Sequence, residues 1–299
     1  MLPLPPTGVF PPSVTPLDAD ERLDEAGLER QLERLIGAGV HGFFMLGTSG
    51  EGTTLTDETR WAAIHATHKI VAGRVPIIAS AMDTSTARVL ENIKGMSDVG
   101  VDAVAISPPY YFAPFHDRDM LAFFTTLAEK SELPIFMYNI PSTTKVTLSV
   151  DVIAQLAALD NVIGVKDSTG DWSHGLELLD RVAERDDFSV FIGSHLSAGQ
   201  GLMYGARGAI MSLVNLDPVT CLALFEAGRS GDVAETVRCT RRLLRLGMIF
   251  RHGAQPPALK TALELMGVCS HYSTHPNLPL TPEAVVFVET TLRELELLE

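Results

Sequence analysis

Eight short apolar segments rich in β-branched residues alternate with helical stretches along most of the chain, and this alternation constrains the fold most strongly. Strands are expected at Gly8–Thr15, His41–Thr48, Val75–Ala81, Ala103–Pro109, Pro134–Asn139, Val162–Ser168, Ser189–Ser194 and Gly208–Val214. Strands that are apolar throughout and separated by helices predict a parallel sheet with helices on its outer face. Eight units predict a closed (β/α)8 TIM barrel. An open nucleotide-binding sheet would instead carry a glycine-rich turn after the first strand, where this chain has Thr15-Pro-Leu-Asp18.

Helical periodicity fills the intervals between these strands. The barrel helices are expected at Glu21–Ile36, Asp57–Val71, Thr84–Val99, Asp117–Lys130, Val150–Leu159 and Trp172–Ala183. The strand pattern stops near residue 232, and three helices are expected at Asp232–Phe250, Pro257–Met266 and Pro282–Leu298. The sequence therefore predicts a barrel over residues 1–231 that carries the active site, and a C-terminal three-helix appendage over residues 232–299.

Charge and composition exclude several classes of partner. The net charge is −14, from 23 basic and 37 acidic residues, whereas nucleic acids and anionic membranes need a basic face. The N-terminal segment has no signal-peptide pattern, and no apolar run reaches the roughly 20 residues of a membrane helix. We therefore expect a cytoplasmic protein. His65 and His68 share a helix face without a third ligand nearby, so no metal and no cofactor are expected.

One of the six lysines, Lys166, lies in the apolar strand segment Val162–Ser168. Burial lowers the pKa of an amine and yields the neutral nucleophile that a Schiff base with a keto acid requires. The alternative to an imine-forming residue is a structural lysine, whose ammonium reaches water or pairs with a carboxylate. Its rival as the nucleophile, Lys145, lies in a polar segment that is typical of an exposed loop.

Polar residues follow several of the predicted strands, where barrel enzymes place their chemistry. Strand two ends in the glycine-rich turn Gly47–Gly52, in which Thr48 and Ser49 could bind a small carboxylate, although a plain tight turn is at least as good an interpretation of this segment alone. Glu51 could be catalytic, but a role in orienting the turn is favoured. Strand five carries Tyr138, a phenol suited to proton transfer beside an imine, although a core tyrosine is an equal alternative. Strand four ends in a proline-stiffened loop with Tyr110 and Tyr111, which could equally be a packing surface.

These segments together resemble the dihydrodipicolinate synthase / N-acetylneuraminate lyase family of pyruvate-dependent class I aldolases. The resemblance covers essentially the whole chain and is carried, in order, by Gly47-Thr-Ser-Gly-Glu51, Pro109-Tyr-Tyr111, Tyr138-Asn-Ile-Pro141, Gly164-Val-Lys-Asp-Ser168, Gly193 and Gly205-Ala-Arg-Gly-Ala-Ile210.

The resemblance implies a role for each matching position. Lys166 would form the Schiff base, Tyr138 would be the general acid and base, and Thr48 would belong to a proton relay. Thr48 and Ser49 would bind the carboxylate of the keto acid, and Gly193 and Ile210 would line the pocket floor. Tyr111 resembles the tyrosine that family members contribute to a neighbouring subunit's site, which implies a homo-oligomer, expected to be a homotetramer.

Two departures from the family pattern bear on the substrate. Thr143 stands where members that make dihydrodipicolinate have an arginine for the amino-acid carboxylate, and threonine cannot replace a bidentate guanidinium. Ser168 replaces an alanine found in many of those synthases, and a hydroxyl there matches sugar-acid lyases of the family. Sialic-acid lyases have acidic residues after strand seven, however, where this chain has Ser194-His195-Leu196, so that substrate is also doubtful.

The sequence thus favours a Schiff-base lyase, an aldolase or dehydratase, acting on a 2-keto-3-deoxy sugar acid or hydroxy-keto acid. The alternative is 4-hydroxy-tetrahydrodipicolinate synthase, which condenses pyruvate with aspartate semialdehyde. A third interpretation is a non-catalytic ligand-binding barrel, but such a protein would have no need of an imine-forming amine.

Overall fold

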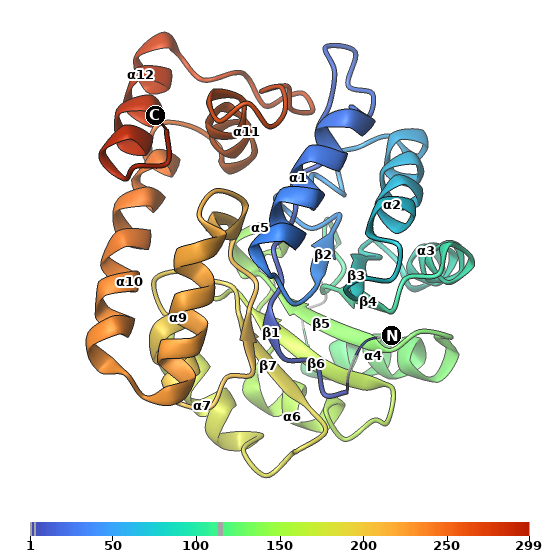
Figure 1. Cartoon of the computed structure of the whole chain (residues 1–299). Coiled ribbons are helices and arrows are strands. Elements are labelled where there is room, and N and C mark those ends of the chain that lie inside the picture. Colours follow the sequence, from blue (N-terminus) through green and yellow to red (C-terminus); the bar gives the residue numbers. More distant parts are fainter. Residues whose placement is uncertain (1, 3, 113–115, 299) are drawn as a thin grey trace.

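The chain forms a parallel (β/α)8 barrel with helices around it, as predicted (Figure 1). The computed structural model describes residues 2, 4–112 and 116–298. Its strands are β1 (Gly8–Val9), β2 (Phe43–Met45), β3 (Ile77–Ser80), β4 (Ala103–Ile106), β5 (Ile135–Asn139), β6 (Val162–Asp167), β7 (Ser189–Ile192) and β8 (Gly208–Ala209). They pair in the order β1-β8-β7-β6-β5-β4-β3-β2. Backbone hydrogen bonds from His41 N to Val9 O and from Phe44 N to Pro11 O, both 3.0 Å, join β1 to the β2 segment and close the barrel.

Each of the eight predicted segments contains a strand, but most strands end earlier than expected. β1 ends before Pro11 and Pro12, and β4 ends before Pro108 and Pro109. A proline has no N–H to donate to a ladder, so pairing stops there. β2 ends before the glycine-rich turn at Gly47. The residues beyond the strand ends instead form the loops that surround the site.

The barrel helices follow the predicted order. They are α1 (Glu25–Ala38), α2 (Asp57–Val71), α3 (Thr86–Val99), α4 (Asp117–Lys130), α5 (Pro141–Thr144), α6 (Val150–Leu156), α7 (Trp172–Arg181), α8 (Ala198–Met203) and α9 (Pro218–Ser230), with a 3-10 turn η1 (Ser212–Asn215). The bounds predicted for α2 and α4 are confirmed, and the Thr56 hydroxyl caps α2 by accepting from Thr59 N. The prediction did not delimit α5, α8 or α9; α5 and α8 are too short for a periodic signal.

The C-terminal region contains three α-helices, as predicted, at shorter lengths. They are α10 (Val233–Leu246), α11 (Gln255–Leu265) and α12 (Pro282–Glu294), with a 3-10 turn η2 (Gly247–Arg251) between the first two. Figure 1 shows α10 beside α9, and α11 and α12 together at one end of the molecule. No helix in the described ranges is long and apolar enough to cross a membrane.

The barrel interior has its own apolar core, separate from the layer between strands and helices. It includes Phe10, Phe44, Phe136 and Phe191. The Phe191 ring meets those of Phe10 and Phe136 edge to face, and the Phe44 ring meets that of Tyr138. Gly164 keeps this interior closely packed, because a Cβ there would lie 2.5 Å from both the Phe136 ring and the Ser189 carbonyl oxygen. Tyr138 and Ile210 complete the core toward the C-terminal ends of the strands, so the candidate site rests on a filled interior.

Candidate active site

Lys166 lies at the C-terminal end of β6, directly beside Tyr138 of β5. The register of these parallel strands pairs the two residues, and their side chains are only 4% and 2% exposed. The Lys166 Nζ atom lies 4.0 Å from the centre of the Tyr138 ring and 4.4 Å from the centre of the Phe44 ring. The amine therefore lies against two aromatic rings. The alternative interpretation of Lys166, as an ammonium paired with a carboxylate, does not match these contacts.

Burial changes the acid–base properties of both groups. It lowers the pKa of the Lys166 amine to about 7, because the charged form loses its hydration. It raises the pKa of the Tyr138 phenol to about 12, although hydrogen bonding with Thr48 and Ser168 works in the opposite direction. At neutral pH a large fraction of the lysine is thus a neutral nucleophile, and the tyrosine keeps its proton and can act as an acid.

Hydroxyl groups surround the Tyr138 phenol. Its oxygen lies 3.2 Å from Thr48 Oγ1, and the two hydroxyls form a hydrogen bond. Ser168, two residues beyond the lysine, reaches the same phenol. A Cβ at Gly193 would lie 1.9 Å from Ser168 Oγ, which explains the glycine at the end of β7. Proton transfer between these hydroxyls is geometrically possible.

The outer face of the same strand pair is also held by polar contacts. The Asn139 side chain donates to Asp167 Oδ1 at 3.2 Å and to Leu148 O at 3.3 Å. His174 lies against Asp167 with its Nδ1 3.6 Å from Oδ1, and burial raises the pKa of that carboxyl. These contacts fix β5 against β6, and with them Tyr138 against Lys166.

A cavity of about 440 Å³ opens above Lys166. It is lined by eight of the nine residues predicted for the site, namely Thr48, Ser49, Tyr138, Thr143, Lys166, Ser168, Gly193 and Ile210. The structure brings these residues together from five strand ends and their loops. Their individual roles remain predictions.

The ninth residue, Tyr111, does not reach this cavity. It is 86% exposed, with a backbone φ of 76°, in the left-handed region that a bulky residue rarely adopts. The neighbouring Phe112 is 84% exposed, and the two rings meet edge to face. Tyr111 therefore cannot serve the Lys166 site of its own chain in this conformation.

The sequence did not indicate the C-terminal wall of the cavity. Phe250, Gln255 and Pro256 line the same cavity as Lys166, which lies more than 80 positions earlier in the chain. The Gln255 side chain donates to Ser49 Oγ at 2.9 Å. His195, from the loop after β7, also lines the cavity, and burial lowers the pKa of its imidazole.

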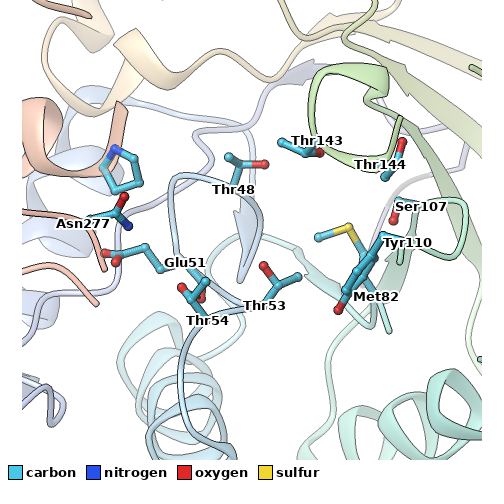
Figure 2. A pocket seen from close by; sticks show the side chains of 11 residues that line it. Thr48, Glu51, Thr53, Thr54, Met82, Ser107, Tyr110, Thr143, Thr144 and Asn277 are labelled. Carbon is cyan, nitrogen blue, oxygen red and sulfur yellow. Dashed lines mark hydrogen bonds between the residues drawn. The ribbon is translucent and has the colours of Figure 1, made fainter. Parts of the chain in front are cut away.

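A second cavity, of about 310 Å³, lies on the other side of Thr48 and Thr143. Figure 2 shows two opposite walls, with side chains from Glu51, Thr54 and Asn277 facing those from Met82, Ser107 and Tyr110. Within the described residues, the linings of the two cavities include no arginine. The departure at Thr143 is thus not offset by a guanidinium from another segment.

Glu51 lies where it can orient the glycine-rich turn, as the sequence suggested. The sequence analysis did not identify its partner, Lys260. Its carboxylate forms a buried ion pair with Lys260 Nζ at 2.5 Å. Lys260 is completely buried in α11, although Lys166 was the lysine singled out from the sequence. The signal was present, because Lys260 interrupts an apolar segment, Pro257–Leu263, that is buried throughout.

Neither rival centre has the required geometry. Lys145 is exposed and donates to Ser142 O at 2.6 Å, so the prediction of an exposed loop residue is confirmed. In the part of the chain that the structure describes, no three His, Cys, Asp or Glu side chains are grouped as ligands for a metal ion.

Comparison with known proteins identifies the family. The family model described as "Dihydrodipicolinate synthetase family" matches residues 5–295. The chain belongs to this family. One relative is the 4-hydroxy-tetrahydrodipicolinate synthase of Phenylobacterium zucineum. It is 33% identical over 97% of this chain and 98% of the relative's chain. The enzyme of the same name from Shewanella pealeana is 34% identical over 92% of both chains.

Solved structures of dihydrodipicolinate synthases have the same fold. The enzyme from Bacteroides thetaiotaomicron superposes with a TM-score of 0.92 at 32% identity, covering 98% of this chain and 99% of that one. The enzyme from Acinetobacter baumannii, solved with pyruvate, gives a TM-score of 0.93 at 29% identity with the same coverage. Members of the family are pyruvate-dependent Schiff-base enzymes, and this chain is a class I lyase of that kind. The relatives' names favour the synthase over the sugar-acid lyase, which was preferred from the sequence.

Proposed function

We propose that the protein binds a pyruvate-type 2-keto acid as a Schiff base on Lys166. The observation that carries this proposal is the contact of a buried amine, with a pKa of about 7, against a tyrosine that is hydrogen-bonded to Thr48. The neutral Nζ attacks the keto carbon and forms a carbinolamine. Loss of water then gives the imine, and removal of a proton from the adjacent carbon gives an enamine.

Tyr138 would move the protons in these steps. As an acid it protonates the departing hydroxyl, which leaves as water, and its phenolate then recovers a proton through Thr48. The Thr48 and Ser168 hydroxyls stabilise the phenolate, since both lower the pKa of this tyrosine. The carboxylate of the keto acid would bind at the turn that contains Thr48 and Ser49.

The reductive trapping of pyruvate tests this proposal. The protein is incubated with pyruvate and borohydride, and the peptide containing Lys166 is expected to gain the mass of the reduced adduct. The Lys166→Met variant is the matched control and should gain nothing. Labelling of Lys145 or Lys260 in its place, or no labelling, would overturn the proposal.

For the part of the substrate beyond the keto acid, the residues that line the cavity and the names of the relatives favour different reactions. Ser142, Ser168, Ser194 and His195 line the cavity beyond Lys166, which suits a neutral, hydroxylated tail. We therefore propose cleavage or dehydration of a 2-keto-3-deoxy sugar acid or hydroxy-keto acid. The relatives' names favour a second candidate, 4-hydroxy-tetrahydrodipicolinate synthase.

One variant separates these candidates. Thr143→Arg supplies the missing guanidinium, whose charge-assisted contact with a buried carboxylate contributes about 2–5 kcal/mol. If the second substrate is not aspartate semialdehyde, the wild type has weak synthase activity and the variant gains at least about 30-fold in kcat/KM. A wild type with efficient condensation of pyruvate and aspartate semialdehyde, weakened by the arginine, would establish the synthase. A panel of 2-keto-3-deoxy acids completes the assignment.

We further propose that Tyr111 completes the site of a second copy in a homo-oligomer, assembled as a tetramer. Its exposed ring and left-handed backbone suit a residue that inserts into a partner. The cavity beside Thr48 and Tyr110 has room for such a ring. One related solved structure is titled as a monomeric dihydrodipicolinate synthase variant, so light scattering on this protein decides. A fully active monomer would refute the proposal.

A further inference from the structure

The turn that would bind the substrate carboxylate is conformationally strained. Leu46 and Glu51, at its two ends, have φ values of 58° and 56°, which residues with side chains adopt at a cost. A Cβ at Gly52 would lie 1.9 Å from the Leu46 carbonyl oxygen, so the two ends of the turn are in close contact. The Glu51 N–H donates to Thr48 O at 3.2 Å. A displacement of Glu51 would therefore move Thr48 directly.

The carboxylate of Glu51 is held by residues of the C-terminal region. Lys260 Nζ lies 2.5 Å from Glu51 Oε1 and donates to the Tyr272 carbonyl oxygen at 2.7 Å. The second carboxylate oxygen, Oε2, accepts from the backbone N–H of Thr274 at 2.7 Å and from its hydroxyl at 2.8 Å. The side chains of Glu51 and Lys260 are 1% and 0% exposed. This network joins the strained turn to residues more than 200 positions later.

A second contact from the same helix reaches the turn independently. The Gln255 side chain at the start of α11 donates to Ser49 Oγ. Since that bond uses the oxygen of Ser49 as an acceptor, the hydroxyl proton of Ser49 remains available for a carboxylate in the cavity. α11 thus contacts the turn at Ser49 and at Glu51, on either side of Gly50.

Stability alone does not account for the ion pair. Replacing a buried ion pair by apolar residues is often neutral or stabilising, so such a pair is weak evidence for a stabilising role. Lys260 is not a second imine-forming amine either, because it lines neither cavity and its Nζ is occupied by Glu51 and Tyr272.

We propose that Lys260 is a positioning residue, which acts through Glu51 to hold the Gly47–Gly52 turn in the geometry that binds the keto-acid carboxylate. This inference rests on the proposed function. The C-terminal helices would thus contribute to substrate recognition through two contacts, Lys260 with Glu51 and Gln255 with Ser49. No atom of Lys260 would touch the substrate.

Two ketones of equal carbon number test the proposal. Pyruvate carries a carboxylate, and hydroxyacetone carries a neutral hydroxymethyl group in its place. The rate of reductive trapping at Lys166 is measured for both with the wild type and with Lys260→Met, Glu51→Gln and the double variant. Arg242→Met is the matched control, because it removes a different ion pair of the C-terminal region, with Asp217 at 2.7 Å, far along the chain from the turn.

Lys260→Met should reduce the rate of pyruvate trapping by about 10- to 100-fold, the range expected for loss of charge-assisted hydrogen bonds. The same variant should reduce the rate of hydroxyacetone trapping by less than about threefold, because this ketone has no carboxylate. The double variant, which leaves no unpaired buried charge, should recover thermal stability but not the preference for pyruvate. Arg242→Met should lower stability and keep that preference.

The outcomes separate this inference from the proposed function. If the wild type does not trap pyruvate at Lys166, the proposed function fails. If the wild type traps pyruvate but the variants lose both ketones equally, Lys260 has a structural role only and the inference is wrong. Should Lys260→Met not fold, the double variant decides, and a double variant with the wild-type preference for pyruvate would overturn the proposal.

Discussion

Burial of the Lys166 amine, which we propose makes this lysine reactive, should also destabilise the folded protein. The unfolded chain holds this lysine protonated, with a pKa near 10.5, whereas burial lowers its pKa to about 7 in the folded state. Between these two values the unfolded state binds more protons, so stability rises with pH. Folding at pH 7 must therefore release a proton from about half of the molecules and keep the others as buried cations, at a cost of about 4 kcal/mol for this shift.

Lys166→Met removes this cost and keeps the length of the side chain. The rings of Phe44 and Tyr138 favour the cation by about 1–2 kcal/mol, which offsets part of the gain. We therefore expect the variant to be about 2–4 kcal/mol more stable than the wild type at pH 7. The difference should fall below about 1.5 kcal/mol at pH 9.5, since the unfolded lysine then also begins to lose its proton.

Urea unfolding followed by circular dichroism, at one protein concentration and at both pH values, measures the difference. The exposed Lys145→Met is the control and should stay within about 0.5 kcal/mol of the wild type at both pH values. A Lys166→Met protein that is less stable than the wild type would show that Lys166 is folded as a well-compensated cation. A stability gain independent of pH would show that packing, and not ionisation, is responsible. Either result would refute the reasoning.

Three further predictions concern other residues of the proposed sites. Tyr138→Phe should slow exchange of the methyl protons of pyruvate with deuterated water by about 10²–10⁴-fold, because enamine formation needs this acid and base; unchanged exchange by NMR would exclude the role. Tyr111→Phe should reduce turnover similarly while trapping at Lys166 persists, and a variant with full turnover would make the tyrosine a packing residue only. Gly193→Ala should impair pyruvate trapping because its Cβ would collide with Ser168 Oγ, and the added change Ser168→Gly should restore trapping; failure of this rescue would contradict the proposed contact.

Local sequence patterns were sufficient for the architecture and made Lys166 and Tyr138 candidates, whose proposed roles came from the family resemblance. An apolar β-branched segment is a local signal, and eight of them in alternation with helices predict a barrel. Lys166 and Tyr138 stood out because each interrupts such a segment with a polar atom. The strand ends were less accurate, since proline and glycine in the following loops end the ladder before the apolar pattern ends. The short helices α5 and α8 span too few residues to show a period.

Contacts between distant segments were decided only by the tertiary structure. The register that pairs Tyr138 with Lys166 depends on how β5 and β6 align, which neither strand encodes alone. The burial of Lys260, and its pairing with Glu51, depends on where α11 packs against the barrel. Tyr111 remains outside its own site because its loop directs it to the surface. The sequence by itself determined which residues could do the chemistry, because side-chain type and strand period are local properties. Closure of the barrel and docking of the C-terminal helices decided which of them meet, because some of those contacts join residues more than 200 positions apart.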